Sequence, residues 1–198
     1  MTGDYFSLLQ LLAPEVITAL TAFIVLGVDL VRGGKQPLQV RMTTCAWIAV
    51  AGCAIAFFSP APNSAGTALA TGVFTSNALI QLAKQIILLL TAATAILSIG
   101  GRFTDHAGEY FSLLLFATVG MLFLVSADNL LMVFLALELT SLCLYVLTAF
   151  DKRSLASAEA ALKYFLFGGV SAAFLLSWLP DLCRLAAMAP SWISPVTP

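Results

Sequence analysis

Long apolar stretches dominate the chain and recur along its length. A transmembrane helix needs about 20 mostly apolar residues. Runs of about this length lie at about 10–31, 41–58, 79–99, 109–125, 129–150 and 155–179. Apolar and polar positions do not alternate within the runs, which disfavours a transmembrane β-barrel. The pattern predicts an all-α integral membrane protein with about six transmembrane helices.

Helix-breaking residues mark where several of the runs should stop. The second run ends at 59–62 (Ser-Pro-Ala-Pro), the third at Gly100 and Gly101, and the sixth at Pro180. The first run lacks the positively charged flank of a signal peptide, so we expect it to be retained as a helix.

The composition agrees with a membrane location. Hydrophobic residues make up 61% of the 198 positions, and charged residues only 10%, against about 25% in typical soluble domains. Nine basic and ten acidic residues leave a net charge of −1. An ordinary soluble domain, a disordered chain and a nucleic-acid binder that relies on a basic patch are therefore excluded.

The basic residues between the runs predict the orientation. Most lie in the loops after the first, third and fifth runs, while the other side carries only Lys84 and Arg184. The loop residues are Arg32, Lys35, Arg41, Arg102, Lys152 and Arg153. The positive-inside rule places these loops in the cytoplasm, so both termini should face outward and the uncharged stretch 60–78 should be external.

Residues that bind metals or cofactors are scarce. The four cysteines form no C-x-x-C pair, and the only histidine is His106, in a polar loop. No set of these residues fits a zinc site or an iron–sulfur cluster, and no phosphate- or dinucleotide-binding motif occurs. We therefore expect no metal or cofactor bound by this chain.

Glu138 is an acidic residue in the middle of the fifth run. It lies about 12 residues, or ~18 Å of helical rise, from Asp151, too deep for its short side chain to reach the interface. Ionisable residues inside a membrane are costly and are candidates for function. A carboxyl that exchanges between its charged and neutral forms can pass protons. The alternative is a permanently neutral Glu138 bonded to a neighbouring helix.

Lys163 lies about eight residues inside the sixth run, four positions after Glu159. This spacing places the two on one helix face in the favourable order. Lys163 either reaches the interface and pairs with Glu159 for solvation, or faces the protein interior. Consecutive helices are usually neighbours, so in the second case Glu138 and Lys163 could meet at a similar depth, where each would control the protonation of the other.

Four segments carry a resemblance to a known family. They are 108–121 (GEYFSLLLFATVGM), 125–131 (VSADNLL), 137–142 (LELTSL) and 157–168 (SAEAALKYFLFG). They resemble the fourth to sixth helices of subunit N of proton-pumping NADH:quinone oxidoreductase, respiratory complex I. The resemblance is close over about 108–176 and looser over the first three helices.

The resemblance implies the N-terminal part of an antiporter-like, inverted-repeat fold. It implies that Glu138, Lys163 and Glu159 belong to a proton relay, and that the chain takes part in proton translocation coupled to quinone reduction as one subunit of the enzyme. It further implies a bacterial inner-membrane location, with the lipid bilayer and the other complex I membrane subunits as partners and no nucleic acid. NADH, FMN, iron–sulfur clusters and quinone are expected in partner subunits.

The chain departs from the family after the sixth helix. Members of the family continue through further helices, including a broken seventh helix whose lysine partners the fifth-helix glutamate. The stretch 177–198 no longer resembles them, and it contains four prolines. We expect a three-helix region (1–107), the start of the proton-channel module (108–179) and a divergent tail (180–198). A shifted reading frame is our hypothesis for the truncation, and we expect no proton conduction by an isolated copy.

Two alternative functions stay open. The first is a subunit of a multisubunit cation/proton antiporter, which shares the antiporter-like fold. The second is a non-conducting structural membrane subunit in which Glu138 never ionises.

Overall fold

The computed structural model describes residues 12–32, 37–59, 74, 77–100, 106–151 and 154–188, without the side chains of Arg32, Leu182, Cys183 and 185–188. This part contains six α-helices and a short 3₁₀ helix, η1 (Ser98–Gly100). The α-helices are α2 (Ala13–Arg32), α3 (Leu38–Phe57), α4 (Ala78–Leu97), α5 (Ala107–Ser126), α6 (Leu130–Thr148) and α7 (Leu155–Met188). All six are long and apolar enough to span a membrane, which confirms the predicted fold class.

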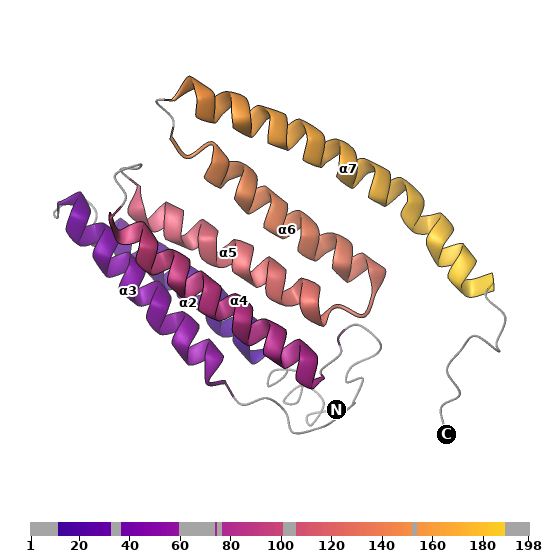
Figure 1. Cartoon of the computed structure of the whole chain (residues 1–198), viewed down its shortest axis with the longest axis horizontal. Helices are drawn as coiled ribbons and strands as arrows, with labels where there is room; N and C mark the ends of the chain where they lie inside the picture. Colours follow the sequence, from indigo (N-terminus) through magenta and orange to yellow (C-terminus); the bar gives the residue numbers. More distant parts are fainter. Residues whose placement is uncertain are drawn as a thin grey trace.

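The helices lie side by side as an antiparallel bundle (Figure 1). Helix α5 is central, because it packs against α2, α3, α4 and α6. Helix α6 follows on one side, and α7 packs against α6 and against no other helix in the described part of the chain. The resulting arrangement is a four-helix group, α2 to α5, with α6 and α7 added outward from α5.

Small residues allow the helices of the four-helix group to approach closely. The buried face of α3 is made mostly of small side chains spaced three or four positions apart: Met42, Cys45, Ala46, Ala49, Gly52, Cys53 and Ala56. In membranes, where no hydrophobic force draws helices together, such small-residue faces favour association through close packing. Larger side chains from α4 and α5, including Leu88, Phe111, Leu115 and Leu122, fill the remaining interior.

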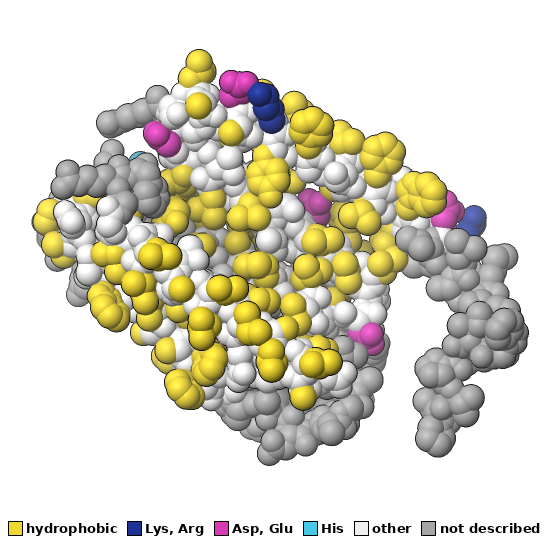
Figure 2. All heavy atoms as spheres, in the orientation of Figure 1, with side chains coloured by type: hydrophobic (Ala, Val, Ile, Leu, Met, Phe, Trp, Pro, Cys, Tyr) yellow, Lys and Arg dark blue, Asp and Glu magenta, His cyan; other side chains and the backbone are white. Residues whose placement is uncertain are grey.

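The outside of the bundle is apolar as well. Figure 2 shows hydrophobic side chains spread over the visible face, with charged side chains mostly near its edges. Helix α7 exposes an especially large apolar surface, with Phe167, Phe174 and Trp178 among its exposed side chains. A surface of this kind is stable in lipid, where exposed apolar side chains carry no hydration cost.

The end of the last helix differs from the prediction. We predicted a stop at Pro180, but α7 continues through this residue to Met188. The prediction was wrong because a proline removes one backbone hydrogen bond and can bend a helix without ending it. Figure 1 shows α7 curving along its length.

Some sequence predictions fall on residues outside the described ranges. These are the external loop over most of 60–78, the loop charges Lys35, Arg102, Lys152 and Arg153, and the last ten residues of the tail. The division of the chain at residues 107 and 179 stays a prediction.

A glycine sets the spacing between α6 and α7. A Cβ atom at Gly168 would collide with the phenol oxygen of Tyr145, whereas a Cβ atom at Gly169 would meet nothing within 4 Å. Tyr145 is buried, and its ring packs edge-on against Tyr164 and Phe165 of α7. The contact between α6 and α7 therefore depends on the missing side chain at position 168.

We expect Gly168→Val to loosen α7 from α6. Overpacking of a tight contact typically costs about 1–3 kcal/mol, so the full chain in detergent micelles should unfold at lower temperature, measured by tryptophan fluorescence. Gly169→Val is the matched control, because it adds the same side chain one position along the helix into open space. Equal destabilisation by the two variants would contradict this account of the α6–α7 contact.

Candidate functional site

Glu138 lies near the middle of α6, as the sequence predicted, with a half-buried side chain. Neighbouring α5 comes very close here, since a Cβ atom at Gly120 would collide with the hydroxyl of Thr140. Thr140 donates a hydrogen bond to the carbonyl of Ala136 in its own helix. The structure therefore holds a carboxyl group well inside an otherwise apolar helix of the bundle.

The structure does not bring Glu138 and Lys163 together. Ser157 of α7 donates a hydrogen bond to the carbonyl of Thr148 of α6, which relates the two helices near their connection. Counted inward from this contact, Glu138 is ten positions away and Lys163 six, a difference in depth of ~6 Å. The two residues thus lie at broadly similar depths, but within the described residues they form no ion pair, because Lys163 contacts Glu159.

Lys163 pairs with Glu159 instead. Its Nζ lies 2.6 Å from Glu159 Oε1, which confirms that the two share a helix face. The side chains are 66% and 62% exposed, respectively. This geometry favours the solvation alternative for Lys163 in the chain as it stands.

A second ion pair, which the sequence analysis missed, lies buried in the four-helix group. Lys84 Nζ of α4 lies 2.5 Å from Glu15 Oε1 of α2, and the side chains are 3% and 0% exposed. Ser126, the last residue of α5, donates a longer hydrogen bond of 3.4 Å to the same carboxylate oxygen. Oε2 of Glu15 has no hydrogen-bond partner in the described structure.

The sequence pattern gave the wrong environment for Lys84. Lys84 was counted as an exposed charge opposite the cytoplasmic loops, whereas it is buried within α4. A heptad pattern was the available signal: Lys84, Thr91 and Ser98 recur every seven positions and so lie on one helix face. A lysine within an apolar run needs an acidic partner.

The same face of α4 carries two further polar contacts with α5. The hydroxyls of Thr91 and Thr118 lie 3.0 Å apart, and those of Ser98 and Tyr110 also lie 3.0 Å apart. Hydrogen bonds between helices inside a membrane contribute modestly to stability and fix which residues face each other. The polar contacts thus define the register between the second half of α4, with η1, and α5.

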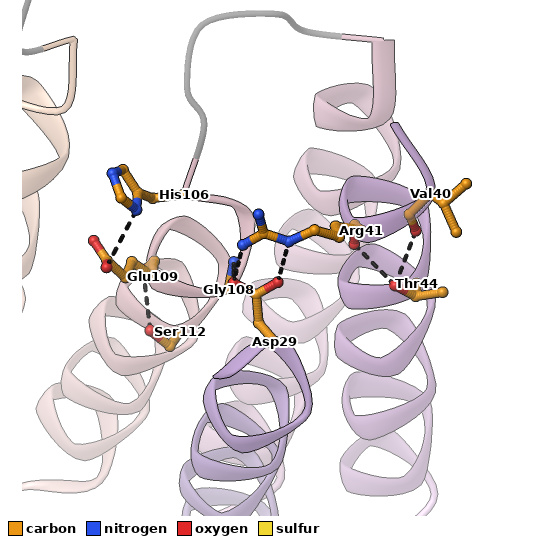
Figure 3. Close-up of polar contacts among 8 residues, drawn as sticks. All are labelled: Asp29, Val40, Arg41, Thr44, His106, Gly108, Glu109 and Ser112. Atoms are coloured by element: carbon orange, nitrogen blue, oxygen red, sulfur yellow. Dashed lines mark hydrogen bonds and ion pairs between the residues drawn. The ribbon is translucent and has the colours of Figure 1, made fainter. Parts of the chain in front are cut away.

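An ion pair also closes the opposite end of α2, as Figure 3 shows. Arg41 of α3 donates two hydrogen bonds, of 2.8 and 2.7 Å, to the two carboxylate oxygens of Asp29. The backbone N–H of Gly108, at the start of α5, donates a third bond of 3.0 Å to Asp29. Asp29 therefore joins α2, α3 and α5.

The remaining candidate groups are dispersed. His106 lies 3.5 Å from Glu109, and both side chains are half exposed (Figure 3). The described residues contain no group of three or more His, Cys, Asp or Glu side chains that could hold a metal ion.

Comparison with protein families gives one matching model, described as "NADH:quinone oxidoreductase/Mrp antiporter, TM", over residues 127–179. The match contains Glu138, Glu159 and Lys163 and covers α6 with most of α7.

Curated relatives match over most of the chain. NADH-quinone oxidoreductase subunit N 2 of Acidobacterium capsulatum is 46% identical over 182 residues, which cover 87% of this chain and 37% of the relative. NADH-quinone oxidoreductase subunit N of Desulfovibrio desulfuricans is 36% identical over 183 residues, 89% of this chain and 35% of the relative. The chain spans little more than a third of the length of these relatives.

A solved structure agrees with the sequence matches. A chain of respiratory complex I from Thermus thermophilus, determined with bound aureothin, superimposes with a TM-score of 0.57 at 30% sequence identity. The match covers 83% of this chain and 35% of that chain.

The buried pair predicts a specific pattern of stability. Lys84→Met leaves the Glu15 carboxylate without its counter-charge, and breaking one side of a buried pair typically costs about 3–5 kcal/mol. Adding Glu15→Gln should restore part of this loss, because no unpaired charge then remains. Unfolding of the full chain in detergent micelles measures both effects.

Lys163→Met is the matched control, since it breaks a pair of the same chemistry that is exposed. We expect a much smaller loss of stability from this variant. A loss equal to that of Lys84→Met, or no recovery in the double variant, would contradict the buried-pair account.

Proposed function

Because this chain belongs to the antiporter-like membrane-subunit family of NADH:quinone oxidoreductase subunit N, we propose that it takes part in proton translocation coupled to quinone reduction. The carboxyl of Glu138 is the observation that carries this proposal. It lies mid-helix in α6, inside the matched region 127–179.

Glu138 acts in this proposal as the intramembrane proton carrier. In a medium of low dielectric constant, the carboxylate and the neutral carboxyl differ strongly in solvation energy, so a nearby change of charge shifts the balance between them. A proton binds when the site loses a neighbouring positive charge and leaves when one returns. This coupling allows distant redox chemistry to drive proton movement.

Glu159 and Lys163 act at the start of α7, near the surface of the bundle. Their ion pair is exposed in the described structure, with 2.6 Å between Nζ and Oε1. We infer that they supply or receive protons at this surface, some distance from Glu138. A direct ion pair between Lys163 and Glu138 is not part of the proposal.

The remainder of the enzyme lies in other subunits. We propose that NADH, FMN, the iron–sulfur clusters and quinone bind there, and that the exposed apolar surface of α7 faces lipid or neighbouring membrane subunits. The orientation proposed from the loop charges puts the Asp29 end of α2 at the cytoplasmic face of a bacterial inner membrane.

The names of the curated relatives favour this function over that of a cation/proton antiporter subunit. The curated relatives from Acidobacterium capsulatum and Desulfovibrio desulfuricans are named as subunits of NADH-quinone oxidoreductases, and another relative, 34% identical, is F(420)H(2) dehydrogenase subunit N of Methanosarcina mazei. The family description itself covers both NADH:quinone oxidoreductase and Mrp antiporters.

Glu138→Gln should impair transport with little effect on assembly. The amide keeps the size of the side chain but cannot exchange a proton, so proton pumping per quinone reduced should fall to roughly a tenth or less, given the scale on which positioned proton-transfer groups contribute. The measurement is the NADH-driven pH gradient in inverted membrane vesicles, with native gels to quantify the complex.

Glu109→Gln provides the control for this substitution. Glu109 lies in the first turn of α5 with a half-exposed side chain, so the same chemical change there should leave pumping unaltered. Normal pumping by a fully assembled Glu138→Gln complex would overturn the proposed role of Glu138.

Membership of a larger complex gives a separate prediction. An affinity-tagged copy of the full chain, expressed in its own host, should copurify from mild detergent with a particle that oxidises NADH and reduces quinone. Copurification with a cation/proton antiporter lacking NADH oxidation would favour the alternative function.

A further inference from the structure

The buried pair of Glu15 and Lys84 has an incomplete set of hydrogen bonds. An ionised carboxylate has about four acceptor positions. Glu15 uses Oε1 for both Lys84 and Ser126, while Oε2 is buried and has no partner in the described structure. Buried polar atoms normally have a partner, since leaving one unpaired is costly. Oε2 is thus a position where a proton or a water molecule can bind.

The pair also lies where it can exchange protons with the surface. Glu15 is the third residue of α2, and Ser126 is the last residue of α5. The backbone of Lys84 lies about two turns inside α4. Side chains of helical residues point back toward the helix N-terminus, so the ammonium group of Lys84 is directed to the end of the bundle where Glu15 and Ser126 lie. The site is therefore buried within about a turn or two of the helix ends.

Two helices that do not touch are joined by this contact. Helices α2 and α4 each pack against α3 and α5, and their described backbones make no close approach to each other. The Lys84 side chain spans the space between them. A change in its charge alters the attraction between α2 and α4 directly, because the carboxylate is its only ion-pair partner within the described residues.

Among the residues that the structure describes, few other titratable groups share this end of the four-helix group. Asp128 follows α5 and is exposed, and α3 contributes the buried thiol of Cys53 on its side facing α4. The other described ionisable side chains of these helices lie toward the opposite end: Asp29, Arg41, Cys45, Glu109 and Tyr110. Glu15 and Lys84 therefore depend mainly on each other for their charge states.

We propose that Glu15, Lys84 and Ser126 form a second proton-exchange site, separate from Glu138, at the end of the bundle opposite the start of α7. A hydrogen ion binds Oε2 of Glu15 and forms an O–H bond, which leaves the Lys84 ammonium without its counter-charge. Lys84 then releases one proton to water at the surface. Transfer of the proton from Glu15 to the neutral Lys84 amine restores the ion pair, so that one hydrogen ion enters and one leaves.

The site deepens the proposed function, since it handles the same ion, and its physiological role rests on that function. The exchange itself requires neither Glu138 nor redox chemistry. A chain in which Glu138 transports nothing would still bind and release protons at Glu15 and Lys84, so the two proposals fail separately.

Solid-state NMR of the full chain in lipid vesicles tests the exchange. The δ-carboxyl carbon of Glu reports ionisation, and the ζ-nitrogen of Lys distinguishes ammonium from amine. The chain has four Glu and four Lys residues. ¹³C–¹⁵N dipolar coupling detects the short Glu15–Lys84 and Glu159–Lys163 contacts, and Glu159→Gln removes the second signal, which assigns the first. We expect the two resonances to shift together over one shared pH range.

Variants then show whether the shifts are linked. In Glu15→Gln, the Lys84 ¹⁵N resonance should no longer change over that pH range. Ser126→Ala should move the pH range of the shared change, and Ser126→Thr should restore it. The exposed pair serves as control, because Glu159→Gln should leave the Lys84 and Glu15 signals unchanged. A carboxylate and an ammonium that persist at every pH at which the chain stays folded would overturn the proposal and identify a permanent structural ion pair.

Discussion

The low dielectric constant of the membrane interior is the constraint on which this structure depends. A charge in such a medium is stable only beside an opposite charge or a set of hydrogen bonds. The chain meets this requirement for Asp29 with Arg41 and for Glu15 with Lys84, at opposite ends of α2. Glu138 has no ion-pair partner within the described residues, which distinguishes it from these pairs.

The helix packing follows from the same constraint. With no water to hydrogen-bond, polar side chains bond within the bundle, and the contacts of Thr91 with Thr118 and of Ser98 with Tyr110 align α4 with α5. Small residues on α3 then allow the backbones to approach. Helix α5 lies between α2, which carries an ion pair at each end, and α6, which carries Glu138, because it packs against both helices.

Local sequence patterns predicted the helices well and the pairings between them poorly. Apolar runs of membrane-spanning length located all six helices in the described chain. The partner of Lys84 is 69 positions away in sequence, so only the tertiary arrangement reveals it. Glu138 was found because a charge in the middle of an apolar run is a local feature, but its distance from Lys163 depends on the register between α6 and α7, which Tyr145 and Gly168 set. The helical residues 181–188 beyond Pro180 were missed because a proline alone does not determine a helix end.

The central claim is that the Glu138 carboxyl gains and loses a proton as the enzyme turns over. Time-resolved infrared difference spectroscopy of the assembled complex during NADH oxidation measures this directly, through the C=O band of a protonated carboxyl. The account predicts a band that rises and falls with turnover and is missing from a complex with glutamine at position 138. A Glu138 carboxyl that stays neutral, or stays ionised, throughout turnover would contradict it.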